Sequence, residues 1–327
     1  MNPRTPDPTT AALRPAGVLC CGNTCFDTLV RPVEELRWNA SVWVDSIESS
    51  PGGNGANTST AIAKLGVPVR LLSAVGTDEF AERVLECLGR AGVDRSLIRA
   101  IPGATSTTVV LIRGNGERTF LHHPGVTAEA FDEPPDLGSG IAAGCGYFHL
   151  ANAFALPRLR AHAGETMRRA RAAGLVTAMD TGWDSRGRWL EDLGPALPYT
   201  DYLFVNEREA LKLAGCDSWE QAAARLRDLG ASVVALKRGE HGCAIVDAAG
   251  RLDVPAYDVP AIDSTGAGDC FAGAFLAALS RGLPAASAAQ VANAAGALNV
   301  RSIGATAGLL SWDEMIAWMQ TAPVRRV

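Results

Sequence analysis

Three features are missing from this 327-residue sequence, and each absence argues against a class of protein. No run of eighteen apolar residues occurs, so no segment is predicted to span a membrane. The net charge is −5 and no long Lys- or Arg-rich run occurs, whereas nucleic-acid binders need a basic face. The eight cysteines include no Cys-x-x-Cys pair, which argues against a zinc site or a disulfide framework. We therefore expect a cytoplasmic protein with reduced thiols and a small-molecule substrate, without a nucleic-acid or membrane partner.

The common nucleotide-binding motifs are also absent. There is no G-x-x-x-x-G-K-[ST] phosphate loop, no G-x-G-x-x-G after a strand and no H-R-D catalytic loop. The glycines cluster instead in two other segments, 52–55 and 266–268. Glycine lets the backbone approach a ligand closely, so these segments are the candidates for a binding site.

Hydrophobic patterning predicts an α/β protein with a parallel sheet. Short apolar runs, typical of buried strands, alternate with helix-favouring segments through much of the chain. Such alternation places helices on both faces of a parallel sheet. The expected strands are 18–21, 69–75, 147–150, 176–180, 202–205 and 233–236. The expected helices are 55–65, 78–91, 156–173, 206–214, 218–229, 268–281, 285–301 and 312–319.

A second, more exposed sheet is predicted from insertions near 28–48 and 104–123. The first insertion has β-formers at 42–44 in a half-polar pattern. The second contains two β-rich runs, 107–112 and 118–121, separated by Gly-Asn-Gly, which favours a hairpin. We expect the two insertions to form a small lid over the main sheet.

The segment Asp263-Ser-Thr-Gly-Ala-Gly-Asp269 precedes an apolar helix. Successive N–H groups from Gly266 to Asp269 can converge on an anion at the N-terminus of this helix. A bound phosphate would repel a carboxylate beside it unless that carboxylate accepted a proton, so Asp269 is a candidate general base. The alternative is that Gly266, Gly268 and Asp269 form an ordinary capped turn.

Two long patterns carry a family resemblance. The stretch D-S-T-G-A-G-D-C-F-A-G-A-F-L, from Asp263 to Leu276, resembles the C-terminal signature of the PfkB carbohydrate kinases, and Gly52-Gly-Asn-Gly-Ala-Asn57-Thr-Ser resembles their N-terminal signature. The resemblance covers about 18–311 and implies a ribokinase-like fold, a three-layer α/β/α doubly wound sheet with a small β-sheet lid. It also implies ATP-dependent phosphorylation of a hydroxymethyl group on a small sugar or sugar-like substrate.

The resemblance implies a role for individual residues. Asp269 is the implied catalytic base, and Gly266, Ala267 and Gly268 form the implied anion hole. The substrate hydroxyls are expected to contact Asp27, Gly52, Gly53, Asn54 and Asn57. For Asp27, a surface position in a strand-exit loop is the alternative.

The resemblance also implies nucleotide and ion sites. ATP contacts are expected from Asn206, Lys237, Gly239, Gly242 and Asn293. Glu209 ends an N-x-x-E motif and is implied to order Mg²⁺ through water and phosphate. Asp263 and Thr265 lie near positions that bind a monovalent cation such as K⁺ in many relatives. Helix capping is the alternative for the N-x-x-E motif and for Asp263 and Thr265. A common glycine-rich hairpin turn is the alternative for the segment 237–242, and a satisfied polar residue on a helix face is the alternative for Asn293.

The acceptor stays open on sequence grounds. Several ribokinase-like sugar kinases carry an acidic residue where Ala151 and Asn152 stand here, which weakens an assignment to ribose. Trp38 and Trp43 in the lid region are candidates for stacking on a purine, so an adenosine-like nucleoside kinase on the same fold is the alternative. A third hypothesis, a nonenzymatic sugar or nucleotide sensor, predicts a degraded base or anion hole, and neither is degraded.

The remaining expectations concern the lid and the assembly. Strand alternation places Arg118 and His122 on one face of the hairpin, where they either touch an anionic or hydroxylated substrate or face solvent. The small sheet has edges and apolar faces that it cannot cover alone, which predicts a homodimer. Residues 1–16, rich in Pro and Thr, are predicted to be a disordered leader, and residues 17–327 one kinase domain.

Overall fold

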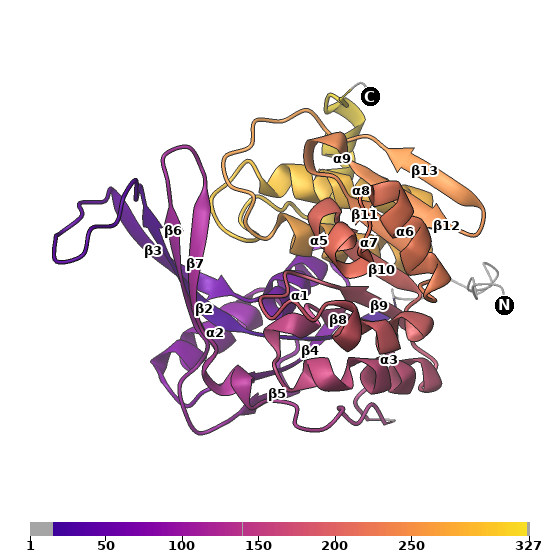
Figure 1. Ribbon diagram of the computed structural model, residues 1–327, viewed down its shortest axis with the longest axis horizontal. Helices are drawn as coiled ribbons and strands as arrows, with labels where there is room; N and C mark the ends of the chain where they lie inside the picture. The colour runs from indigo at the N-terminus through magenta and orange to yellow at the C-terminus, as the bar shows by residue number, and fades with distance from the viewer. Residues whose placement is uncertain (1–15, 139, 326–327) are drawn as a thin grey trace.

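The computed structural model describes residues 16–138 and 140–325, and its centre is one large sheet (Figure 1). The strand order in this sheet is β13-β12-β11-β10-β9-β8-β1-β4-β5. These strands are β1 Gly17–Gly22, β4 Val69–Val75, β5 Ile98–Ala100, β8 Cys145–Ala151, β9 Val176–Asp180, β10 Tyr202–Asn206, β11 Val233–Lys237, β12 Cys243–Asp247 and β13 Gly250–Val254. Pairing is parallel from β5 to β11, and β12 and β13 run antiparallel to their neighbours. The strand order reverses beside β1, and open α/β sheets bind ligands at such a point.

Helices cover both faces of this sheet and complete a three-layer α/β/α sandwich. The α-helices are α1 Asn54–Lys64, α2 Glu79–Arg90, α3 Ala163–Ala172, α4 Leu190–Leu193, α5 Glu207–Ala214, α6 Trp219–Asp228, α7 Ala267–Ser280, α8 Ala285–Asn299 and α9 Trp312–Thr321. The 3₁₀ helices are η1 Gly125–Ala128, η2 Ala153–Ala155, η3 Leu159–His162, η4 Gly194–Tyr199 and η5 Gly239–His241. Within β1, Val18 and Cys20 belong to the core under α1, α2, α7, α8 and α9, whereas Leu19 and Cys21 belong to the core under α3, α5 and α6. The predicted doubly wound architecture is confirmed.

A separate small sheet projects from one side of this body (Figure 1). Its order is β3-β2-β6-β7, with the strands β3 Ser46–Gly52, β2 Cys25–Arg31, β6 Thr107–Ile112 and β7 Arg118–His123. The pairing register places Asp27, Thr108 and His122 side by side on one face. Because alternate residues share a face, Arg118 lies on this same face. We call it the inner face, because it carries Asp27 and Arg118 toward the body, and we call the opposite face the outer face.

The predicted strand at 42–44 is wrong. Residues 41–44 have no regular structure, and the lid strand is instead β3, although it contains Ser49, Ser50 and Pro51. Backbone pairing along seven residues of β2 outweighs the low β propensity of this segment. Trp38 and Trp43 are 97% and 94% exposed, and neither lines the cavity that contains Asp269.

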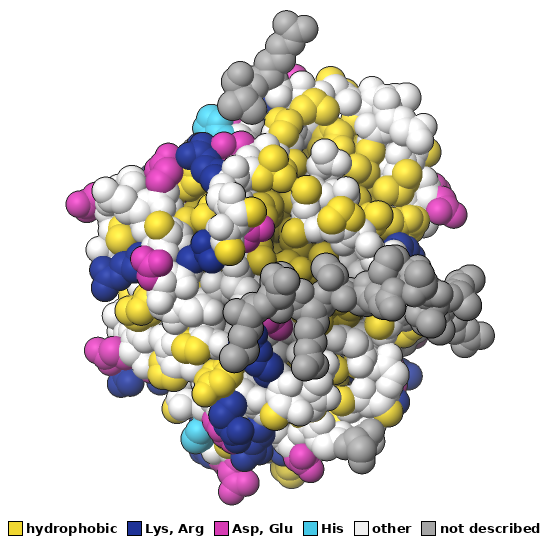
Figure 2. Space-filling model, turned by 90° about the vertical axis from the view of Figure 1, so that its right-hand side faces the viewer, with side chains coloured by type: hydrophobic (Ala, Val, Ile, Leu, Met, Phe, Trp, Pro, Cys, Tyr) yellow, Lys and Arg dark blue, Asp and Glu magenta, His cyan; other side chains and the backbone are white. Residues whose placement is uncertain are grey.

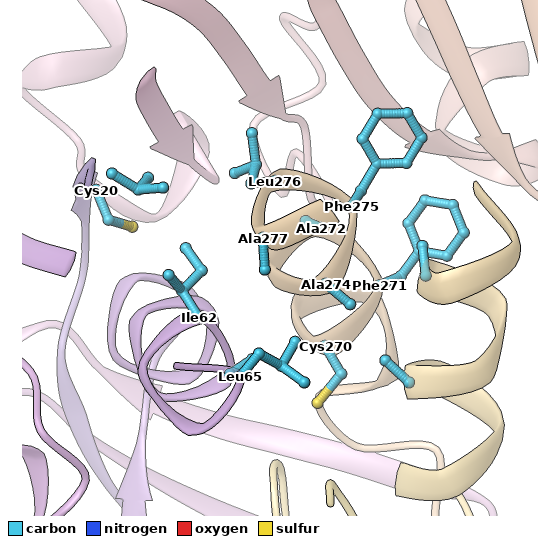
Figure 3. Packing of buried hydrophobic residues seen from close by; sticks show 14 of the residues in the cluster. Cys20, Ile62, Leu65, Cys270, Phe271, Ala272, Ala274, Phe275, Leu276 and Ala277 are labelled. Carbon is cyan, nitrogen blue, oxygen red and sulfur yellow. The ribbon is translucent and has the colours of Figure 1, made fainter. Parts of the chain in front are cut away.

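Helix α7 lies in the interior, and its position determines where the glycine-rich motif before it can act. Its residues 269–279 are all buried, because the helix is apolar around its whole circumference. Figure 3 shows Ile62 and Leu65, at the end of α1, on one side of α7, and Phe271 and Phe275 on the other. The Phe275 ring lies 5.2 Å from the ring of Phe204 in β10. Helix α7 is therefore packed tightly between α1 and the sheet, and its N-terminus is held in place.

Other predicted elements agree with the observed ones, with four exceptions. Strand β5, the hairpin β12–β13 and the short helix α4 were not predicted, and the helix expected over 156–173 is α-helical only from Ala163. Pro157, which lacks an N–H donor, lies in the segment before η3. The leader expected at 1–16 lies outside the described residues except for Ala16.

The described surface and helices add two observations. On the side of the body turned away from the lid, acidic and basic side chains are interspersed around a more hydrophobic centre (Figure 2).

Among the described helices, none is both long enough and apolar enough to cross a bilayer.

Candidate active site

The predicted anion hole lies at the N-terminus of α7. Gly266 is the N-cap with φ of 70°, and a Cβ there would lie 2.1 Å from the carbonyl oxygen of Ala305, so only glycine fits. The first N–H groups of a helix have no partner inside it. The N–H of Ala267 donates to the carbonyl oxygen of Ser264 at 3.3 Å, whereas the N–H groups of Gly266, Gly268 and Asp269 bond to no backbone carbonyl of the described residues. The anion hole at 266–268 stays a prediction.

Asp269 is buried in the first turn of α7, and its side chain does not cap the helix. Its Oδ1 accepts a hydrogen bond from Nδ2 of Asn54, and its Oδ2 accepts one from Nδ2 of Asn57, both at 2.8 Å. Burial raises the pKa of Asp269 to about 6, although the two amides act in the opposite direction. A carboxyl with a pKa near neutrality is suited to general base catalysis, and the capping alternative does not describe this side chain.

Two residues expected to hold the substrate therefore orient the candidate base. Asn54 and Asn57 lie on the first turn of α1, three positions apart, and so present their amides to the same partner. A third amide supports them, because Nδ2 of Asn152 donates to Oδ1 of Asn54 at 2.9 Å. Asn152 has φ of 54°, a left-handed conformation that asparagine tolerates better than most residues. The sequence singled out Asn152 as a departure from the family pattern but did not predict this role.

A buried charge cluster lies beside the anion hole. Nζ of Lys237, at the end of β11, is 2.8 Å from Oδ2 of Asp180, at the end of β9. A Cβ on Gly268 would lie 3.3 Å from the same Nζ, so this ammonium borders the hole. Burial opposes the charge on Lys237, but Asp180 and Glu209 overcome this effect and raise its pKa above the ordinary value. Asp180 was missed from the sequence, although the carboxyl ends of the parallel strands β9 and β11 lie at the same edge of the sheet, on either side of β10.

Glu209 caps helix α5 and also lines the cavity next to Asp269. It forms a capping box with Asn206, in which the Glu209 N–H donates to Oδ1 of Asn206 at 2.9 Å and the Asn206 N–H donates to Oε2 of Glu209 at 3.1 Å. Its Oε2 also accepts from the hydroxyl of Thr181 at 2.9 Å. Burial raises the pKa of Glu209, and the carboxylate of Asp180 adds to the effect. Both residues of the N-x-x-E motif line the cavity, so the capping alternative is correct without excluding the site.

These oxygen donors fit Mg²⁺. The carboxylates of Glu209 and Asp180 share one cavity with the amide of Asn206, and Mg²⁺ typically takes one or two carboxylates together with phosphates and water. Two buried carboxylates beside one lysine leave negative charge that a divalent cation would offset.

Two of the residues expected to bind the acceptor, Asp27 and Gly52, lie on strands of the lid. Asp27 lies in β2 and not in a loop, and a Cβ on Gly52 would lie 1.9 Å from its Oδ2, so the two expected substrate residues are adjacent. The thiol of Cys25 donates to Oδ1 of Asp27 at 2.9 Å. Burial raises the pKa of Asp27. Next to it on the inner face, Oγ1 of Thr108 is 3.1 Å from Nδ1 of His122.

The nucleotide-side residues line a cavity of about 870 Å³. Its walls include Lys237, Gly239, Gly242 and Asn293, all of which the sequence assigned to ATP. Nδ2 of Asn293 donates to the carbonyl oxygens of residues 254 and 255, both at 3.1 Å, so it also ties α8 to the end of β13. The cavity continues to Asn54 and Asp269 and so joins the nucleotide side to the base.

Asp263 bonds both to Thr265 and to a residue of the lid. Oδ1 of Asp263 accepts from the Thr265 N–H at 2.9 Å, and its Oδ2 accepts from the Gly304 N–H at 2.9 Å. NH1 of Arg118 lies 2.6 Å from Oδ1 of Asp263. Arg118 therefore contacts protein, and it is not free to hold an anionic substrate.

Comparison with known proteins identifies the family. The model of the pfkB family carbohydrate kinases matches residues 16–312. The chain belongs to the PfkB family. As a member it is an ATP-dependent carbohydrate kinase.

Relatives of this PfkB kinase act on more than one kind of sugar. It is 30% identical to the ATP-dependent ribose-1-phosphate kinase of Halopiger xanaduensis, over 88% of this chain and 93% of the relative. It is 29% identical to the aminoimidazole riboside kinase of Salmonella typhimurium, over 83% and 88% of the two chains. A putative ribokinase II from E. coli, solved with ATP and Mg²⁺, superposes with a TM-score of 0.81 at 26% identity, over 93% and 99% of the two chains. The predicted ribokinase-like fold is confirmed.

Proposed function

We propose that this enzyme transfers the γ-phosphoryl group of ATP to a hydroxymethyl group of a neutral sugar or riboside, with Asp269 as the base. The observation that carries the proposal is the position of Asp269, a buried carboxylate in the turn that also presents the free N–H donors. A single location thus offers a proton acceptor for the nucleophile and hydrogen-bond donors for the phosphoryl oxygens. The names of the relatives, a riboside kinase and a ribose-1-phosphate kinase, support a ribose-like acceptor.

The residues suggest how each atom moves. Each oxygen of Asp269 accepts one amide hydrogen bond and keeps a further lone pair for the acceptor hydroxyl. As the hydroxyl oxygen bonds to the γ-phosphorus, its proton passes to Asp269 and the bond to the β,γ-bridging oxygen breaks, releasing ADP. The N–H groups of Gly268 and Asp269 and the ammonium of Lys237 stabilise the charge on the phosphoryl oxygens. Mg²⁺ held at Glu209 and Asp180 would add charge neutralisation.

The acceptor side favours a neutral ligand. The residues proposed to bind it there, Asp27, Gly52 and Gly53, supply a carboxylate and backbone groups. The nearby guanidinium of Arg118 is already bonded to Asp263. Burial lowers the pKa of His122, so its imidazole is mostly neutral near pH 7. A hydroxyl that pairs with a buried carboxylate gains about 1.5–3 kcal/mol, whereas a phosphate there would be repelled.

A coupled ADP-release assay tests the proposal across pentoses, hexoses, keto-deoxy sugar acids, nucleosides and ribose 1-phosphate. We expect turnover with a neutral sugar or riboside at a kcat/KM at least about tenfold above that with ribose 1-phosphate. Mass spectrometry of the product should locate the phosphate on the hydroxymethyl oxygen. Turnover confined to phosphorylated or carboxylated acceptors would contradict the neutral-acceptor proposal.

A further inference from the structure

Arg118 joins the lid to the segment that leads into the anion hole. It is the first residue of β7, and 145 positions separate it from Asp263. Its NH1 bonds to Oδ1 of Asp263 and to the hydroxyl of Thr265, and its NH2 bonds to the hydroxyl of Ser264. The side chains of Arg118 and Asp263 are only 16% and 7% exposed. One guanidinium therefore contacts three consecutive residues immediately before Gly266.

The Oδ1 oxygen of Asp263 is fully used. Each carboxylate oxygen has about two lone-pair sites. Oδ1 of Asp263 accepts the N–H of Thr265 at 2.9 Å, the hydroxyl of Thr265 at 2.6 Å and NH1 of Arg118 at 2.6 Å. Oδ2 accepts the N–H of Gly304 at 2.9 Å. A cation bound at Oδ1 would have to displace one of these donors, and Arg118 already places a positive charge there, so this oxygen does not fit K⁺.

A positive charge stabilises the ionised form of Asp263. Burial opposes ionisation of Asp263, but hydrogen bonds from Gly304 and Thr265 and the charge of Arg118 overcome it and lower its pKa. A buried carboxylate without a cation is strongly unfavourable. Arginine stays charged at every accessible pH, and its planar fork suits several oxygen acceptors at once.

We infer that the guanidinium of Arg118 takes the place of a monovalent cation at the Asp263–Thr265 segment, so that the enzyme works without K⁺. This inference rests on the proposed function only where turnover is measured. It makes Arg118 a positioning residue: it fixes the segment from which Gly266 and the N–H donors of α7 continue. Because Arg118 belongs to the lid, the charge is in place only while the inner face lies against the body, and lid position is thereby coupled to the shape of the anion hole.

Three variants separate this role from a simple surface contact. Arg118→Met removes the charge and keeps much of the side-chain length, and Arg118→Lys keeps the charge without the fork. Arg113→Met is the matched control, because Arg113 lies on the same hairpin and pairs only with the exposed Glu117 among the described carboxylates. Melting temperature, ATP affinity and turnover are measured for each in potassium chloride and in choline chloride at equal ionic strength.

We expect the wild-type chain and Arg113→Met to differ by less than about twofold between the two salts in turnover and ATP affinity. Arg118→Met should lose at least about tenfold in turnover in choline chloride and recover several-fold in potassium chloride, with a higher melting temperature in potassium. Arg118→Lys should remain insensitive to potassium, because its ammonium supplies the charge.

Three results would overturn the inference: potassium activation of the wild-type chain by about tenfold or more, an Arg118→Met variant that behaves as wild type, or one that is impaired but indifferent to potassium. If Arg118→Met does not fold, activation of Arg118→Lys by potassium would also overturn the inference. Melting temperature and ATP affinity need no acceptor, so they decide the question even if no sugar is phosphorylated.

Discussion

Replacing Asp269 with asparagine should make the protein more stable and almost inactive. The pKa of Asp269 is about 6 in the folded chain, against an ordinary value of 3.8. At about 1.4 kcal/mol per pH unit, this difference means that the ionised carboxylate costs the folded state about 3 kcal/mol near neutral pH. The introduced asparagine would carry no charge, but its own NH₂ would face an amide donor of Asn54 or Asn57. One mismatched hydrogen bond costs about 1–2 kcal/mol, so we expect a net gain of about 1–2 kcal/mol.

The gain should depend on pH in a defined direction. A carboxyl whose pKa is raised on folding contributes most to stability below its unfolded pKa, and the contribution disappears as pH rises through the folded pKa. From about pH 5 to about pH 7.5, wild-type stability should therefore fall by about 1.4 kcal/mol relative to Asp269→Asn. His149, whose pKa burial lowers to about 4, has the opposite dependence but is present in both proteins and cancels in the comparison.

Activity should change much more than stability. A positioned general base contributes about 10²- to 10⁴-fold, and asparagine cannot accept the proton. ATP affinity should stay the same or increase, because a negative charge facing the γ-phosphate is removed. Urea unfolding at several pH values, nucleotide binding and turnover on the same preparation test these expectations. Turnover within about tenfold of wild type, or a variant less stable than wild type near pH 7.5, would refute the reasoning.

Three further predictions follow from the site and the lid. Asp27→Ala should raise the acceptor KM by about 10- to 100-fold and leave ATP affinity unchanged, because it removes hydroxyl contacts alone; loss of ATP binding would contradict this. Asn152→Ala should free the Asn54 amide, raise the pKa of Asp269 further and shift the acidic limb of the pH–rate profile to higher pH, whereas an unmoved limb would rule out the relay. We propose that the chain is a homodimer through the outer lid face, where Ile47 and Leu121 are 66% and 58% exposed. Leu121→Arg should then sediment as a monomer, and a wild-type monomer at micromolar concentration would exclude this interface.

Sequence patterning predicted the sheet because its physical cause is local. In Val69–Val75 and Val176–Asp180 the apolar runs coincide with strands, since a strand covered on both faces must be apolar along its length. Patterning gave the wrong strand in the lid. The β-formers at 42–44 lie in an exposed segment without regular structure, and the actual strand, β3, is rich in serine. Its stability comes from pairing with β2, a contact that no local pattern records.

The residues of the candidate site also fall into two groups: those that a local motif predicts, and those whose partners are distant in the sequence. Asp269 and Gly266 were predicted because a short motif contains both the base and the turn that exposes the N–H donors. The roles of Asn152 and Arg118 were not, because each depends on a partner about 100 or more positions away: 98 residues separate Asn152 from Asn54, and 145 separate Arg118 from Asp263. Such contacts exist only once the sheet order brings the carboxyl ends of distant strands and the lid to one place. A polar residue that departs from a family pattern is therefore best tested for a new partner across the fold before its position is treated as a loss of function.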